Sequence, residues 1–137
     1  MFFYYFSYLS KKKVRFFMSR IDANKCTLEE AVPLNQEGHL DDSQIGNYGY
    51  RVFYHVPRME LSKSGEFGNL PEDCVAGEIE FTVDKDGIQN GEVLLWMTVE
   101  DLDGGFTNED FVSYNDMDVI SALVDDFNNQ EKDVSRS

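Results

Sequence analysis

Regular alternation of apolar and polar residues marks two segments of the chain as β-strands. Residues 48 to 56 read YGYRVFYHV, with tyrosines and valines at every second position. Residues 78 to 84 read EIEFTVD, which places Ile79, Phe81 and Val83 on one face and acidic or hydroxyl side chains on the other. A period of two indicates strands that bury one face and leave the other in water.

The segment that follows the second strand predicts a hairpin. Residues 85 to 91, KDGIQNG, contain two turn signals, and residues 92 to 100, EVLLWMTVE, form the next apolar run. This run is apolar on both faces, since Leu94 and Trp96 alternate with valine, leucine and methionine. We therefore expect residues 78 to 100 to form a β-hairpin whose second strand lies centrally in the sheet.

Helical periodicity is clearest near the C-terminus. The apolar positions of NDMDVISALVDDFNNQ that share one helical face are Val119, Ile120, Leu123, Val124 and Phe127. Asn115 is the predicted N-cap of this helix. A shorter helix is expected from Thr27, which is spaced from Glu30 like a capping box, and Pro33 should end it.

The remaining segments are mostly predicted loops. Residues 35 to 47 are polar, and residues 58 to 77 are expected to form a long loop, with RMEL as an alternative extension of the preceding strand. Pro57 should end that strand or place it at a sheet edge. In residues 99 to 111, VEDLDGGFTNEDF, capping-box spacing predicts a strand-to-helix corner, and a short strand at FVSY is the alternative.

These elements predict an α+β fold: an antiparallel sheet of three to five strands with the C-terminal amphipathic helix packed on one face. The sheet residues expected under that helix are Ile79, Phe81, Val83 and Trp96. Residues 18 to 130 are predicted to form a single acidic domain, and residues 131 to 137 are predicted to be a frayed tail.

Residues 1 to 17, MFFYYFSYLSKKKVRFF, differ in composition from the rest of the chain. We interpret them as a doubtful N-terminal extension that is translated upstream DNA, with the start at Met18, or else as a disordered segment. Their apolar stretch is too short to span a bilayer, and their lysines follow it rather than precede it as in a signal peptide. An interfacial membrane anchor is the alternative.

The charge of the chain is strongly negative and unevenly distributed. The formal net charge is -14, and residues 69 to 137 contain 18 acidic side chains against 3 basic ones. A field of this sign repels nucleic acid and anionic membranes and attracts a basic protein partner. Solubility alone is the competing explanation of the charge.

The sequence contains no motif for metal binding or catalysis. Residues 84 to 95 begin like an EF-hand loop, but Gln89 and Leu95 replace the required glycine and glutamate. A loop starting at Asp101 fails at the same two positions, although a non-EF cation site there is an alternative. Cys26 and Cys74 have no motif spacing and are expected to be reduced thiols, although their pairing stays open. We predict no metal and no cofactor, and a protein that is more plausibly not an enzyme.

The leading hypothesis is a non-catalytic, cytoplasmic acidic binding protein that masks a basic partner such as a nuclease or a DNA-binding protein. Small immunity proteins, antitoxins and anti-restriction proteins share its size and composition. The acidic residues predicted to form one binding face are Glu78, Glu80, Asp84, Asp86, Asp101, Asp103, Asp118, Asp125 and Asp126. Asp101 and Asp103 have no predicted local role and are the first candidates in this set.

Two other hypotheses remain open from the sequence. The first is a small enzyme or ligand-binding domain with a pocket between the sheet and the 57 to 77 loop, using Arg51, Tyr54 and His55. The second is a self-associating accessory protein in which the aromatic strand at residues 48 to 56 forms a homodimer contact.

Overall fold

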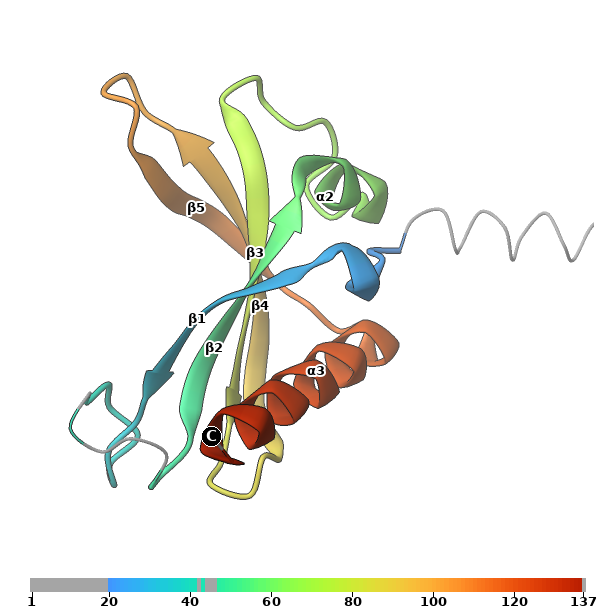
Figure 1. Cartoon of the computed structure of the whole chain (residues 1–137). Helices are drawn as coiled ribbons and strands as arrows, with labels where there is room; N and C mark the ends of the chain where they lie inside the picture. Colours follow the sequence, from blue (N-terminus) through green and yellow to red (C-terminus); the bar gives the residue numbers. More distant parts are fainter. Residues whose placement is uncertain (1–19, 42, 44–46, 137) are drawn as a thin grey trace, which may run out of the picture.

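The computed structural model of the chain describes residues 20 to 41, residue 43 and residues 47 to 136. Within them, five antiparallel strands form one sheet in chain order: β1 (Thr27–Pro33), β2 (Tyr50–Pro57), β3 (Cys74–Val83), β4 (Gln89–Glu100) and β5 (Phe106–Ser113). A 3-10 helix, η1 (Ala23–Lys25), precedes β1, and the helices α2 (Arg58–Ser64) and α3 (Met117–Arg136) lie on the same face of the sheet (Figure 1). The predicted α+β fold is confirmed. The N-terminal extension at residues 1 to 17 lies outside the described residues.

The β2, β3 and β4 strands form the centre of the sheet and pair as the alternation predicts. Tyr54 of β2 lies opposite Ile79 of β3, which lies opposite Leu95 of β4. The β3–β4 hairpin is therefore confirmed, and β4 is an interior strand because it also pairs with β5. Pro57 ends β2 without placing it at an edge, since β2 lies between β1 and β3.

The core lies between the sheet and α3. The buried core residues of the two layers include Val52, Tyr54, Ile79, Phe81, Val83, Leu95, Val119, Ile120, Leu123 and Phe127. The Phe127 ring meets the ring of Tyr50 edge-on at 5.6 Å between centroids. Trp96 is not part of this contact, contrary to the prediction, because it faces the opposite side of the sheet, where its ring packs against Phe111.

Residues 27 to 33 form β1, so the short helix predicted there is wrong. Thr27 pairs with His55 and Pro33 with Tyr50, and Leu28 and Ala31 pack against the core. Asp22, five residues earlier, accepts a hydrogen bond from the Asn24 N–H and caps η1 instead. A capping-box spacing is a local preference, and strand pairing with β2 together with apolar burial outweighs it.

The long loop predicted for residues 58 to 77 is also wrong, because it contains α2 and the first residues of β3. RMEL begins a helix rather than extending β2. Leu61 is buried against β3, where a Cβ at Gly77 would lie only 2.9 Å from the Leu61 side chain. The glycine therefore allows α2 to pack directly on the sheet, which the local sequence could not reveal.

Residues 106 to 113 form β5, so the strand-to-helix corner predicted at Thr107 is wrong, and the alternative strand at FVSY is part of a longer strand that begins at Phe106. Val112 lies opposite Leu95 and packs against the core. These tertiary contacts favour an extended strand over a helix in this segment. Asp110 has a positive φ of 49° at the point where the register with β4 shifts. This bulge separates Phe106–Glu109 from Phe111–Ser113.

The C-terminal helix begins one residue later than predicted. Asp116, rather than Asn115, accepts a hydrogen bond from the Val119 N–H, at 3.4 Å. The helix extends to Arg136, residue 137 lies outside the described residues, and the frayed tail expected from residue 131 stays a prediction. Asn128 donates a hydrogen bond to the Gly87 carbonyl at 2.9 Å, so α3 is also tied to the β3–β4 turn.

Candidate functional site

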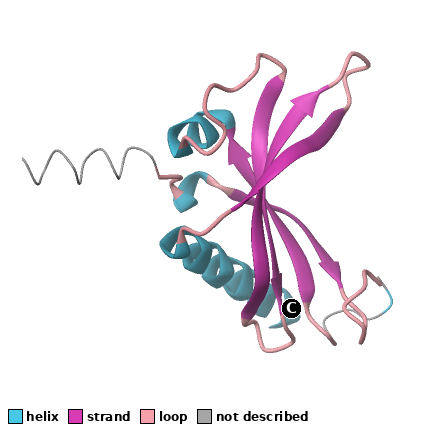
Figure 2. Cartoon of the chain, turned by 180° about the vertical axis from the view of Figure 1, so that it is seen from behind, coloured by secondary structure: helices cyan, strands magenta, loops and turns pink. Residues whose placement is uncertain are grey.

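One face of the sheet has no helix over it in the described part of the chain. Both α2 and α3 lie on the opposite face (Figures 1 and 2). We call the uncovered side the outer face. It carries the alternate positions of every strand, including Glu78 and Glu80 of β3, Trp96 of β4 and Phe111 of β5. These are partly or fully accessible side chains, in contrast to the buried ones beneath α3.

A first row of side chains crosses the outer face from β2 to β5. The Arg51 Nε lies 3.4 Å from a Glu80 carboxylate oxygen, and the Trp96 Nε1–H donates a hydrogen bond to the other oxygen at 2.8 Å. The Trp96 ring then contacts the Phe111 ring, with 4.9 Å between their centroids. Phe111 is 54% exposed, so the row ends in an accessible aromatic surface.

A second row lies beside the first and is richer in carboxylates. His55 Nδ1 lies 3.8 Å from Glu29, and His55 is directly opposite Glu78 in the strand register. Asn108 donates a hydrogen bond to Glu78 and accepts one from the Thr98 hydroxyl. This row joins all five strands, which brings together residues separated by up to about eighty positions in the chain.

Glu78 is the most electrostatically perturbed carboxyl of the outer face. Its pKa is raised to about 7, chiefly by burial of the carboxyl and further by the neighbouring Glu29 and Glu30 carboxylates, while the Asn108 hydrogen bond opposes the shift. The Glu78 carboxyl therefore keeps its proton to a higher pH than a fully solvated glutamate does.

The nine acidic residues predicted to form one face are distributed over three parts of the molecule. Glu78 and Glu80 lie on the outer face. The residues Asp118, Asp125 and Asp126 belong to α3 on the other side of the sheet. The turns at the two ends of β4 hold the rest: Asp84 and Asp86 in the β3–β4 turn, and Asp101 and Asp103 in the β4–β5 turn.

Two of the turn acids and one acid of α3 hold local structure together. Asp84 accepts hydrogen bonds from the N–H groups of Asp86 and Ile88, and Asp101 does the same for Asp103 and Gly105. Such side-chain contacts stabilise tight turns. Asp126 accepts a hydrogen bond from Tyr54. The expectation that Asp101 has no local role is therefore wrong.

The pocket predicted from Arg51, Tyr54 and His55 is not formed. Arg51 and His55 lie on the outer face, whereas Tyr54 is fully buried on the other side beneath α3. Alternate residues of a strand point to opposite faces, so no pocket can gather all three. The aromatic strand suggested for self-association is β2, and both of its edges are already paired, with β1 and β3.

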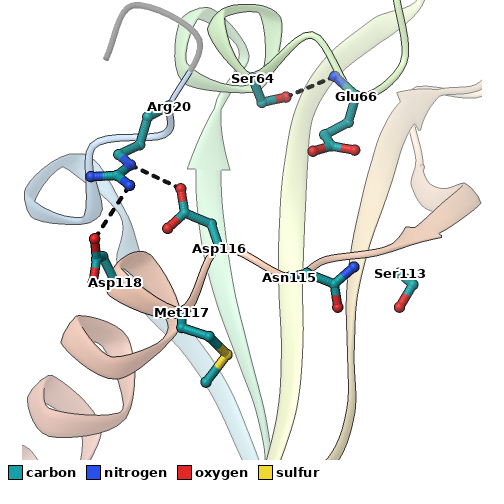
Figure 3. Close-up of a pocket in the computed structure, with 8 residues that line it drawn as sticks. All are labelled: Arg20, Ser64, Glu66, Ser113, Asn115, Asp116, Met117 and Asp118. Carbon is teal, nitrogen blue, oxygen red and sulfur yellow. Dashed lines mark hydrogen bonds and ion pairs between the residues drawn. The ribbon is translucent and has the colours of Figure 1, made fainter. Parts of the chain in front are cut away.

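A groove of about 570 Å³ opens where α2 ends and α3 begins (Figure 3). Arg20 lies in it, with its Nε 2.9 Å from Asp116 and a terminal nitrogen 3.3 Å from Asp118. The single positive charge of Arg20 thus offsets part of the negative charge at the start of α3. The sequence could not indicate this groove, because Arg20 and Asp116 are 96 positions apart.

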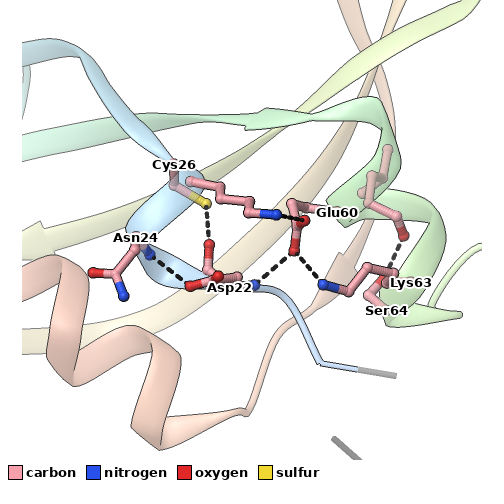
Figure 4. Close-up of polar contacts among 8 residues, drawn as sticks. Asp22, Asn24, Cys26, Glu60, Lys63 and Ser64 are labelled. Atoms are coloured by element: carbon pink, nitrogen blue, oxygen red, sulfur yellow. Dashed lines mark hydrogen bonds and ion pairs between the residues drawn. The ribbon is translucent and has the colours of Figure 1, made fainter. Parts of the chain in front are cut away.

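A buried carboxylate, Glu60, fastens the N-terminal segment to α2 (Figure 4). Its side chain is 1% exposed, accepts a hydrogen bond from the Asp22 N–H at 2.8 Å, and lies 3.0 Å from Lys63 and 3.8 Å from Lys25. The nearby Cys26 thiol is also buried. Burial and the negative charges of Glu60 and Asp22 raise its pKa to about 12, so this thiol is held in its protonated form.

Three further features of the described residues bear on function: the cysteines, possible metal ligands and possible membrane-spanning helices. Cys26 and Cys74 are both buried and free. In the ranges that the structure describes, no three histidine, cysteine, aspartate or glutamate side chains converge to hold a metal ion. None of the helices among the described residues has the length and apolar character needed to cross a membrane.

Comparison of the chain with protein-family models, with curated proteins and with solved structures finds no match. The function therefore has to be argued from the surface itself.

Proposed function

We propose that this protein is a non-catalytic acidic binding protein that masks a basic partner, such as a nuclease or a DNA-binding protein, through the outer face of its sheet. The observation that carries the proposal is the accessible Trp96–Phe111 ring pair bordered by Glu78 and Glu80. Aromatic rings next to carboxylates suit the lysine and arginine side chains of a basic surface, through cation–π contacts and ion pairs.

The distribution of charge supports the same proposal. Residues 89 to 113, which form β4, β5 and the turn between them, contain six acidic side chains and no lysine or arginine. One side of this hairpin forms part of the outer face. Such a field speeds the encounter with a positively charged protein and disfavours nucleic acid.

The compartment proposed for the protein is the cytoplasm. Its two cysteines are free and buried, as is usual in reducing compartments where disulfides are rare. No cofactor or metal has a place in this proposal, since binding through rings and carboxylates requires neither.

The proposal can be tested by capture from a lysate of the source cells, followed by purification of what is captured. The expected result is a basic protein that binds at low salt, is released by high salt, and loses its nucleic-acid binding when the acidic protein is added. Phe111→Ser should weaken the purified complex by about tenfold or more, because exposed aromatic anchors dominate such interfaces. Ile88→Ser, which removes an equally exposed apolar side chain from the β3–β4 turn, is the matched control.

Two variants that each remove one negative charge make the test more specific. Glu80→Gln removes a carboxylate from the outer face, whereas Asp125→Asn removes one from the exposed side of α3. Only the first should reduce affinity and its salt dependence. A captured partner that is itself acidic would overturn the proposal. So would a complex that the controls Asp125→Asn and Ile88→Ser weaken as much as Glu80→Gln and Phe111→Ser do.

A further inference from the structure

β5 is an edge strand whose outer edge has no partner among the described residues. Every side chain from Phe106 to Phe111 is exposed. An edge strand presents a row of N–H and C=O groups that can pair with an added strand. At the opposite edge, β1 ends in Pro33, which has no N–H to donate. β5 is therefore the better of the two edges for pairing.

The negative charge around this edge determines which side chains an added strand should carry. The acidic side chains of the β4–β5 hairpin are Glu92, Glu100, Asp101, Asp103, Glu109 and Asp110, and no basic residue occurs between Lys85 and Lys132. All six are exposed. An extended segment that carries lysine or arginine side chains complements this field, and an acidic or neutral one does not.

Apolar surface at the same edge lies within reach of such a segment. Phe106, 64% exposed, lies opposite Glu100, and Phe111 lies opposite Trp96, so both rings belong to the outer face. Alternate side chains of an added strand would project over this face beside the two rings. Arginine is suited to the position because its planar guanidinium stacks on aromatic rings while pairing with carboxylates.

A second copy of this chain does not fit the edge. Pairing β5 with β5 would bring the Glu109 and Asp110 carboxylates of the two copies close together, and like charges across strands are destabilising. The bulge at Asp110, where φ is positive, also twists the edge away from a long flat pairing. A short segment can still pair with Phe106–Glu109, before the bulge.

We propose that β5 receives a short, extended, arginine- or lysine-bearing segment of the partner as a sixth strand of the sheet, paired with Phe106–Glu109. This inference rests on the proposed function and specifies how the basic partner is held. It adds main-chain hydrogen bonding to charge attraction, which is how strand addition combines affinity with side-chain specificity.

A synthetic peptide in which arginine alternates with valine is a direct probe. Two derivatives are N-methylated, one at the odd and one at the even peptide nitrogens, which leaves the charge unchanged but removes donors from one edge of the strand or the other. The parent peptide should bind the full chain at low salt and slow amide exchange within Phe106–Glu109 by about tenfold or more. One N-methylated derivative should lose about tenfold in affinity and the other should not, since only one edge of the peptide faces β5.

Variants of the protein control for simple charge attraction. The double variant Glu109→Gln/Asp110→Asn should weaken binding of the parent peptide several-fold, and Asn tolerates the positive φ at position 110. The variant Asp86→Asn/Asp125→Asn makes the same change in net charge away from β5 and should have a smaller effect.

The outcomes separate strand addition from the proposed function. If the parent and both N-methylated peptides bind equally and β5 amides stay unprotected, strand addition is overturned while charge-based masking survives. If the parent peptide does not bind, strand addition is overturned as well, and the capture experiment still decides the proposed function. Protection confined to β5, with one N-methylated peptide weakened, supports both.

Discussion

The hydroxyl of Tyr54 donates a hydrogen bond to the Asp126 carboxylate at 2.6 Å and so joins β2 to α3 across the main packing interface. Asp126 also accepts a hydrogen bond from Gln130, one helical turn later. Burial and the adjacent carboxylate raise the pKa of the Tyr54 hydroxyl well above its usual value. An acidic residue that the sequence assigns to partner binding is thus part of the contact between the two layers.

Tyr54→Phe should therefore reduce the free energy of unfolding by about 1–2 kcal/mol. The substitution keeps the buried ring but removes the donor to a charged acceptor, and hydrogen bonds to charged groups are worth more than neutral ones. Chemical denaturation monitored by circular dichroism measures the loss. Tyr48→Phe removes a hydroxyl from an exposed side chain and should change stability by less than about 0.5 kcal/mol. Equal effects of the two substitutions would contradict the role of the bond.

Leu123→Asp should cost several kcal/mol or prevent folding, because it places a carboxylate in the core between α3 and the sheet. Leu123 is 1% exposed. Leu123→Ala should cost about 2–5 kcal/mol through lost burial and the cavity it leaves. Ser121→Asp introduces the same charge on the exposed side of the same helix and should be nearly neutral in a thermal or denaturant unfolding experiment.

Glu60→Ala should destabilise the protein by about 2–3 kcal/mol, because it leaves the part-buried Asp22 N–H without its acceptor and empties the space of the side chain. Glu60→Gln keeps an acceptor oxygen and should cost less. Unfolding by denaturant compares the two, and Glu66→Ala, at an exposed position on the same side of the molecule, serves as the control. A loss no greater than that of Glu66→Ala would show that the buried carboxylate does not fasten the N-terminal segment.

Glu78→Gln should change how stability depends on pH. The pKa of Glu78 is raised from 4.5 to about 7, so between these values the folded protein binds more protons than the unfolded chain. Its contribution to stability is therefore fully present below about pH 4.5 and is lost as the pH rises through 7. The variant, which cannot ionise, should gain on the wild type by on the order of 1 kcal/mol between pH 5 and 8, a figure reduced for solvent screening of this half-exposed group.

Denaturant unfolding of wild type and variant at a series of pH values measures this difference. Glu109→Gln, which removes a carboxylate from an exposed position on β5, is the matched control. A stability difference between wild type and Glu78→Gln that stays constant from pH 5 to pH 8 would contradict the raised pKa.

The sequence by itself determined the elements whose periodicity is long and regular. The alternation in β2 and β3, the hairpin that joins β3 to β4, and the apolar stripe of α3 were each predicted, and the predicted buried residues of β3 and α3 lie in or against the core. Burial of apolar surface is the dominant driving force, so a pattern that specifies it survives in the folded protein.

Only the tertiary structure decided the segments whose local signals are weak or contradictory. Thr27–Pro33 and Phe106–Ser113 contain helix-capping patterns but form edge strands, because pairing with β2 and β4 satisfies many of their backbone groups and packs Ala31 and Val112 against the core. Trp96 was assigned to the wrong face for a related reason: β4 is apolar on both faces, and only the position of α3 selects which face is buried. The nine acidic residues also could not be assigned to one surface from the sequence. Whether carboxylates share a surface depends on contacts between elements that are distant in the chain, and no local pattern encodes these contacts.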